Sequence, residues 1–145
     1  MGLVITPGQR IFIDTAPFIY FFEQHTDFGA VVTRLLDSIY DSDAEMISSL
    51  ITYIEITTLP AKQGEHALVA RYRSFFTNSE RLWLQPIDLM VAEEAVRFRS
   101  KYGLRTPDAL QWAAATVANA DIIVTNDSRW QRIHDIPVAL INELA

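Results

Sequence analysis

The chain has 145 residues, 50% of them hydrophobic, and its 12 lysines and arginines against 18 aspartates and glutamates give a formal net charge of −6. This composition is globular, and we expect residues 1–145 to form a single domain. The negative charge argues against coating of nucleic acid or anionic membrane by bulk charge, but it leaves room for a local basic patch. The absence of cysteine excludes disulfides, zinc–thiolate sites, iron–sulfur clusters and cysteine nucleophiles, and it fits a cytoplasmic protein.

Membrane and targeting segments are not expected. The longest stretch without a charged residue, residues 109–120, is rich in alanine and far shorter than the about 20 apolar residues that span a bilayer. The N-terminus lacks a basic region, so we expect no signal peptide. The five glycines are too scattered for a phosphate-binding loop, and the three histidines lack metal-ligand spacing.

The first predicted elements are a strand and two helices. Arg10–Ile13 is a short apolar run that predicts a strand ending at Asp14, and Pro17 suits the first turn of a helix reaching Phe22. Residues 29–40 carry apolar side chains at helical spacing, which predicts an amphipathic helix. The order strand, acid, helix therefore opens the fold.

A second strand and helix follow. Residues 46–48 predict the strand, and Ser49 is suited to cap a helix over residues 50–59. We expect this helix to stop at Pro60. Glu55 lies inside it.

The central part of the chain predicts two helices with a strand between them. One helix covers residues 65–78, and the second runs from a cap at Asp88 to Tyr102 and ends at Gly103. Residues 82–84 are the strand candidate.

Thr106, Pro107 and Asp108 predict the start of the next helix. They supply a cap residue, a proline at the first helical position and an acid at the positive end of the helix dipole. The helix body, residues 109–119, is small and apolar, as expected for a helix packed closely on a sheet.

Two further strands complete the fold. Residues 122–125 form an apolar strand that ends at Asn126 and Asp127, and residues 138–141 form the last strand. Short apolar strands separated by helices, without hairpin turns, indicate an α/β fold with a mainly parallel sheet of about five strands and helices on both faces. Sites in such sheets lie beyond the carboxyl ends of the strands, where Asp14 and Asp127 are found.

Four acids stand beside apolar segments: Asp14, Glu55, Asp108 and Asp127. A buried carboxylate needs a cation or a metal ion as partner, because an unpaired buried charge costs several kcal/mol. Without cysteine or a histidine cluster, four oxygen donors favour Mg²⁺ or Mn²⁺ over zinc. Such ions serve phosphodiester hydrolysis. Structural roles compete with this interpretation, since helix capping, an exposed helix position or a turn would also accommodate these acids.

Four segments in chain order resemble PIN-domain ribonucleases, most closely the VapC-type toxins of prokaryotic toxin–antitoxin pairs. They span most of the chain: Ile11-Phe12-Ile13-Asp14-Thr15, Ser49 with Glu55, Thr106-Pro107-Asp108-Ala109 with Ala114, and Ile123-Val124-Thr125-Asn126-Asp127. One departure is Ala16, where relatives commonly carry asparagine.

The resemblance implies a PIN-like three-layer α/β/α domain and a metal-dependent endoribonuclease that leaves a 5′-phosphate and a 3′-hydroxyl. It implies that Asp14, Glu55 and Asp108 are the main ligands of Mg²⁺ or Mn²⁺ and that Asp127 completes the acidic pocket. Supporting roles around the acids and the ion would belong to Thr15, Thr125 and Asn126. It further implies an RNA substrate, a homodimer and inhibition by a small antitoxin.

A basic cluster leads toward Asp108, formed by Arg97, Arg99, Lys101 and Arg105. A solvated helix face and an RNA-backbone contact are both open interpretations. A net-acidic nuclease needs local positive charge to offset phosphate repulsion.

Two other functions are compatible with parts of this pattern. A catalytically silent PIN-like module that binds RNA or protein would keep the same fold. An RNase H-like nuclease also gathers acids around metal ions, but that fold opens with antiparallel strands, whereas here a helix directly follows Asp14.

Overall fold

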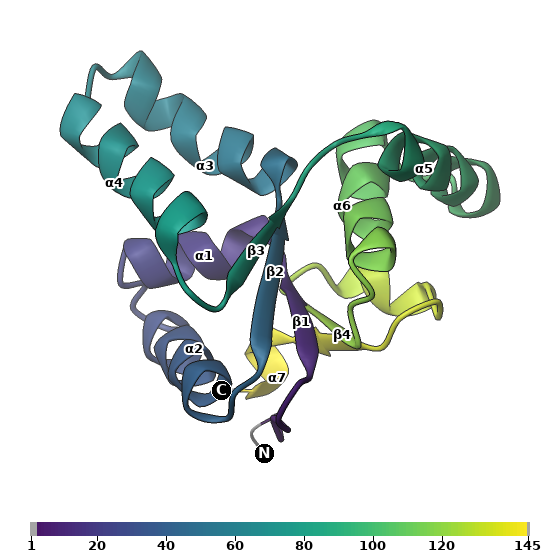
Figure 1. Ribbon diagram of the computed structural model, residues 1–145, viewed down its shortest axis with the longest axis horizontal. Helices are drawn as coiled ribbons and strands as arrows, with labels where there is room; N and C mark the ends of the chain where they lie inside the picture. The colour runs from purple at the N-terminus through teal and green to yellow at the C-terminus, as the bar shows by residue number, and fades with distance from the viewer. Residues whose placement is uncertain (1–2, 145) are drawn as a thin grey trace. The chain divides into compact units, whose positions relative to one another are not determined.

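The computed structural model describes residues 3–144 (Figure 1). The elements are, in chain order, β1 (Arg10–Ile13), α1 (Thr15–Phe22), α2 (Gly29–Asp41), β2 (Glu45–Ser49), α3 (Leu50–Lys62), α4 (His66–Asn78), β3 (Leu82–Gln85), α5 (Leu89–Tyr102), α6 (Thr106–Val117), β4 (Ile122–Thr125), the 3₁₀ helix η1 (Ser128–Arg132), β5 (Val138–Leu140) and α7 (Ile141–Leu144). The strands form one five-stranded sheet in the order β3-β2-β1-β4-β5. Both β1 with β4 and β4 with β5 pair in parallel, so the predicted α/β class with about five strands is confirmed.

The chain divides into two compact units. The first contains the described residues of Met1–Met46 and Asn119–Ala145, and the second is Ile47–Ala118. No helix within residues 3–144 has both the length and the apolar character needed to cross a bilayer.

The first unit is built on the pairing of β1 with β4. In this register Phe12 lies opposite Ile123, and Ile13 lies opposite Val124. All four side chains are fully buried, as expected for strands of a parallel sheet covered on its faces. Helix α1 packs against α2 and β4, and α2 and β5 contact the short helix α7. Strand β1 ends at Ile13 and β4 ends at Thr125, so Asp14 and Asp127 follow the carboxyl ends of these two strands.

The second unit is mostly helical. Helix α5 packs on α6, and α3 packs on both α4 and α6. Trp112 of α6 is fully buried with its ring 5.6 Å from that of Phe98 on α5. Helix α5 begins at Asp88, whose side chain accepts from the Val91 N–H, and it ends at Gly103 with φ 67°, as the sequence predicts. A left-handed cap of this kind favours glycine, which has no Cβ to clash.

Two predicted helix boundaries are wrong. Helix α3 continues through Pro60 to Lys62. The proline sits in the last turn, where one missing N–H bond is tolerated and its own carbonyl accepts from Glu65. Helix α6 is preceded by Arg105 as the cap residue, and no side chain caps it, so Thr106 is its first helical residue.

Two short elements were not predicted. The segment after Asp127 forms η1, and the predicted strand over residues 138–141 ends at Leu140 because Ile141 begins α7. Such short helices carry too few residues to show a periodicity.

Candidate active site

Asp14 is held at the junction of β1 and α1. Its backbone N–H donates to the Val124 carbonyl at 2.9 Å, which continues the β1–β4 ladder by one residue. Its Oδ1 accepts from the Thr15 N–H at 2.8 Å, so the side chain caps α1. Asp14 thus has the capping role expected of an acid at this position, and its half-buried carboxylate has a defined orientation.

Thr125 connects two of the four acids. Its buried hydroxyl donates to Asp14 Oδ2 at 2.7 Å and accepts from the Asp127 N–H at 3.1 Å. This hydroxyl therefore ties the end of β1 to the turn after β4. Sequence reasoning gave Thr125 a supporting role, and the geometry assigns it a specific partner on each side.

Asp127 has a charged partner that the sequence did not reveal. Its two carboxylate oxygens accept from Arg129, Oδ1 from Nε at 2.9 Å and Oδ2 from Nη2 at 2.7 Å. The Arg129 backbone N–H also donates to Oδ1, so Asp127 caps η1. The side-chain hydrogen bonds from Arg129 hold the pKa of Asp127 below its ordinary value, against the opposing effect of partial burial.

Asn126 is directed to other parts of the first unit. Its amide donates to the Tyr20 hydroxyl at 3.1 Å, and its carbonyl oxygen accepts from the Asn142 N–H at 3.3 Å. The side chain therefore links α1 to α7.

The second unit carries the other two acids. Asp108 is half-buried in the first turn of α6, and Glu55 is exposed on α3. Glu55 lies on the solvent side of α3, since Ile54 is exposed with it and Ile56 is buried.

A buried polar network joins these two helices. Gln111 of α6 accepts at Oε1 from the Ser49 hydroxyl and donates from Nε2 to the Thr52 hydroxyl at 2.7 Å. Ser49 also accepts from the Ile51 and Thr52 N–H groups and so caps α3, as predicted. Sequence reasoning missed Gln111, because nothing in the pattern of α6 marks it as different from a core position.

Most of the basic cluster is engaged within the second unit. Arg97 pairs with Glu94 at 2.7 Å, and Arg99 donates to the Leu104 carbonyl and the Thr106 hydroxyl at 3.2 and 3.0 Å. The Lys101 ammonium lies 5.2 Å from the centre of the Tyr102 ring. Arg105, by contrast, is exposed at the N-terminal end of α6.

The donor chemistry of the four acids fits a hard divalent ion. All four side chains are carboxylates, and the chain has no cysteine. Each unit supplies two of them, and within residues 3–144 no group of three or more histidines, aspartates and glutamates forms a metal-binding cluster. Two carboxylates fall short of the six or more oxygen ligands these ions take, so a site would need further oxygen ligands, water among them.

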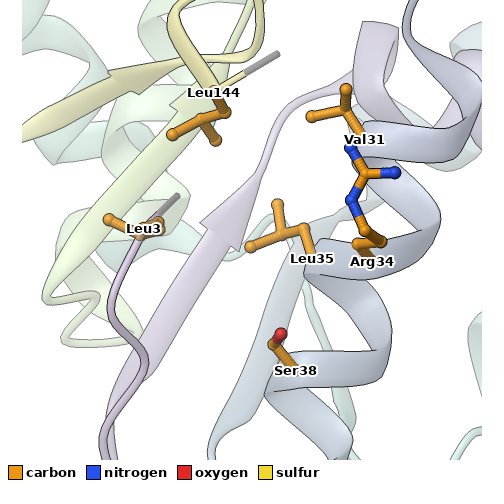
Figure 2. Close-up of a pocket in the computed structure, with 6 residues that line it drawn as sticks. All are labelled: Leu3, Val31, Arg34, Leu35, Ser38 and Leu144. Atoms are coloured by element: carbon orange, nitrogen blue, oxygen red, sulfur yellow. The ribbon is translucent and has the colours of Figure 1, made fainter. Parts of the chain in front are cut away.

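The first unit also contains a cavity of about 230 Å³, lined by Leu3, Val31, Arg34, Leu35, Ser38 and Leu144. Figure 2 shows Leu35 pointing from α2 toward Leu3 and Leu144. None of the predicted site residues lines this cavity, so it is separate from the candidate active site.

This geometry defines the class of protein: a parallel α/β domain with acidic residues just beyond the ends of its strands. The chain belongs to the PIN domain family, whose model matches residues 11–136. This range includes all four acids. No curated protein sequence is significantly similar to the chain.

Solved structures share the fold. One is VapBC2 from Rickettsia felis bound to a DNA fragment from its promoter, with 17% identity and a TM-score of 0.73 over 91% of this chain and 98% of the other. A toxin–antitoxin complex from Klebsiella pneumoniae has 22% identity and a TM-score of 0.68 over 90% of this chain and 97% of the other. VapC20 of Mycobacterium tuberculosis is a toxin that cleaves the sarcin–ricin loop. It has 14% identity and a TM-score of 0.61 over 78% of this chain and 86% of the other. The predicted PIN-like three-layer fold is confirmed, and an RNase H-like fold is excluded.

Proposed function

We propose that this protein is a Mg²⁺- or Mn²⁺-dependent endoribonuclease that hydrolyses phosphodiester bonds and serves as the toxin of a toxin–antitoxin pair. The observation that carries the proposal is the position of Asp14. It lies directly beyond a buried central strand, inside the matched PIN region, with its carboxylate oriented by Thr15 and Thr125. An oriented carboxylate beyond a parallel strand is suited to bind a hard cation.

In this proposal Asp14, Glu55, Asp108 and Asp127 hold the ion. When bound, the ion lowers the pKa of water and stabilises negative charge on the leaving oxygen. The chain's own contribution is to fix the ligands: the Thr125 hydroxyl orients Asp14, and it also holds the Asp127 backbone in place. Arg129 donates two side-chain hydrogen bonds to the Asp127 carboxylate, so it would compete with an ion for this ligand.

Substrate binding is assigned to the exposed end of the basic cluster. Arg105 is exposed one turn before Asp108, which suits it to a phosphate of the RNA backbone. Lys101, also exposed, is a second candidate, since a cation–π contact leaves its charge intact. Arg97 and Arg99 would add positive charge near the RNA, and they also stabilise the fold, because their guanidinium groups bind Glu94 and the Leu104 carbonyl.

A protein partner is part of the proposal. One structure of similar fold, from Klebsiella pneumoniae, is described as a toxin–antitoxin complex, and three others, VapBC2, FitAB and a VapBC from Salmonella typhimurium, are bound to DNA. Helix α5 exposes apolar side chains that would suit a protein interface: Leu89 is 73% exposed, Met90 63% and Val96 65%. We propose a cognate antitoxin, a homodimer of single PIN-like domains, and a cytoplasmic location.

The test is cleavage of RNA by the purified protein with and without Mn²⁺ or Mg²⁺, followed by sequencing of the new 5′ ends. Metal-dependent cuts at defined positions support the proposal. The second candidate, a catalytically silent PIN-like module, predicts binding of RNA or a partner protein without cleavage under every metal condition.

A further inference from the structure

A buried polar connection joins α3 to α6 in the second unit. Gln111 is 2% exposed, Ser49 1% and Thr52 0%. The carboxamide oxygen of Gln111 accepts from the Ser49 hydroxyl, and its NH₂ group donates to Thr52 Oγ1 at 2.7 Å. Both ends of the amide therefore bind α3 or its cap.

This connection specifies how the two helices align. A buried amide that loses a partner pays a desolvation penalty of about 1–3 kcal/mol, so both of its polar ends need partners. Sliding α3 along α6 by one turn would separate Gln111 from Ser49 and Thr52. The three side chains thus favour one register, which apolar packing alone would define less sharply.

The connection lies next to the two acids of this unit. Glu55 follows Thr52 by three residues on α3, and Asp108 precedes Gln111 by three residues on α6. Side chains three apart on a helix are neighbours on one face. Each acid is therefore one turn away from a member of the connection.

We propose that Gln111 is a positioning residue that fixes the placement of Glu55 relative to Asp108 through Ser49 and Thr52. The inference rests on the proposed function, because it assumes that these two carboxylates bind the divalent ion. Gln111 itself contacts neither the ion nor RNA in this proposal. Its contribution is the alignment of the helices that present the ligands.

Helix α3 offers a matched pair of variants for the test. Thr52 and Thr57 are both buried threonines on α3, but within residues 3–144 the Thr57 hydroxyl has no hydrogen-bond partner, whereas the Thr52 hydroxyl binds Gln111. The substitutions Thr52→Val and Thr57→Val are chemically identical. Only the first removes a partner of Gln111.

The first measurement is binding of Mn²⁺ in the absence of RNA, monitored by the electron paramagnetic resonance signal of free Mn²⁺. RNA cleavage is measured in parallel on the same variants. We expect Thr52→Val to weaken Mn²⁺ binding about tenfold or more and to lower kcat with little change in KM. Thr52→Ser, which keeps the hydroxyl, should restore both values, and Thr57→Val should match the wild type. If Thr52→Val binds Mn²⁺ as tightly as Thr57→Val, the positioning role is overturned while the proposed function stands.

The second measurement is independent of metal and activity. The chain has no cysteine, so spin labels can be attached to cysteines introduced at Leu59 of α3, 58% exposed, and at exposed Pro107 of α6. We expect the distance distribution between the labels to broaden or shift in Thr52→Val and Gln111→Leu, and to stay unchanged in Thr57→Val. Identical distributions in all variants would overturn the inference. A wild type that neither binds Mn²⁺ nor cleaves RNA would instead refute the proposed function, whatever the distances show.

Discussion

The Thr125 hydroxyl donates a 2.7 Å hydrogen bond to Asp14 Oδ2 and joins residues that lie 111 positions apart in the sequence. Thr125 is the last residue of β4, and Asp14 follows the last residue of β1. The parallel pairing of these strands brings the two side chains to the same edge of the sheet. The bond therefore depends on strand register, since a shift of one residue would turn Thr125 to the opposite face.

Replacing Asp14 with asparagine separates catalysis from stability. Asparagine keeps nearly the same volume and still caps a helix, but it removes one negative charge from the proposed metal site. We expect Asp14→Asn to lower RNA cleavage by at least about 100-fold while the melting temperature stays close to that of the wild type or rises. Both are measured on the purified protein.

Asp37→Asn is the control for that experiment, because it makes the same change at an exposed position of α2. It should leave cleavage and melting unchanged. Full cleavage by Asp14→Asn would reject Asp14 as a ligand.

Replacing Thr125 with valine tests its link to Asp14. The change keeps the side-chain shape but removes the hydroxyl that donates to Asp14 Oδ2 and accepts from the Asp127 N–H. We expect a loss of about 1–3 kcal/mol in unfolding free energy from denaturant melts, because polar groups lose a partner. Cleavage should fall about 10–100-fold, and Thr125→Ser should recover most of it. A valine variant with wild-type cleavage would show that Thr125 does not orient a ligand.

The Arg129–Asp127 pair predicts a pH dependence of stability. The guanidinium lowers the folded-state pKa of Asp127, so the pair stabilises the fold above the unfolded pKa of about 3.9 and loses this effect as pH falls through the lowered value. We expect Arg129→Gln to melt below the wild type near neutral pH, by a modest amount because the Arg129 side chain is 78% exposed. The difference should disappear in strong acid. A difference that is constant from pH 7 to pH 2 would exclude the ion pair as its cause.

Divalent ions should stabilise the native protein. A ligand that binds only the folded state adds about 2.7 kcal/mol at 100 times its dissociation constant, so Mn²⁺ should raise the melting temperature by several degrees. The shift should be smaller in Asp14→Asn. It should be larger in Arg129→Gln if Arg129 competes with the ion for Asp127, and Ca²⁺ and Na⁺ titrations check for non-specific charge effects. The absence of any shift at millimolar Mn²⁺ would count against the metal site.

Local sequence signals were sufficient for most elements. The apolar runs Arg10–Ile13 and Ile122–Thr125 define β1 and β4 with the boundaries that the structure shows, because a buried parallel strand needs uninterrupted apolar residues. The caps at Ser49 and Asp88 and the stop at Gly103 were also correct, since capping involves only residues a few positions apart. The order of strand, acid and helix correctly placed Asp14 between β1 and α1, since it depends only on neighbouring residues.

Contacts between distant segments could not be predicted in this way. The Thr125–Asp14 bond follows from the register of β1 and β4, and the Gln111 connection follows from the packing of α6 on α3. Even the nearby Arg129–Asp127 pair requires the turn of η1, which is too short to produce a periodic pattern. Sequence specifies which side chains are available and where each strand or helix begins. Hydrogen bonds between elements form only after burial of apolar surface has fixed how those elements pack, and for that reason the partners of Asp14, Asp127 and Gln111 emerged only from the folded chain.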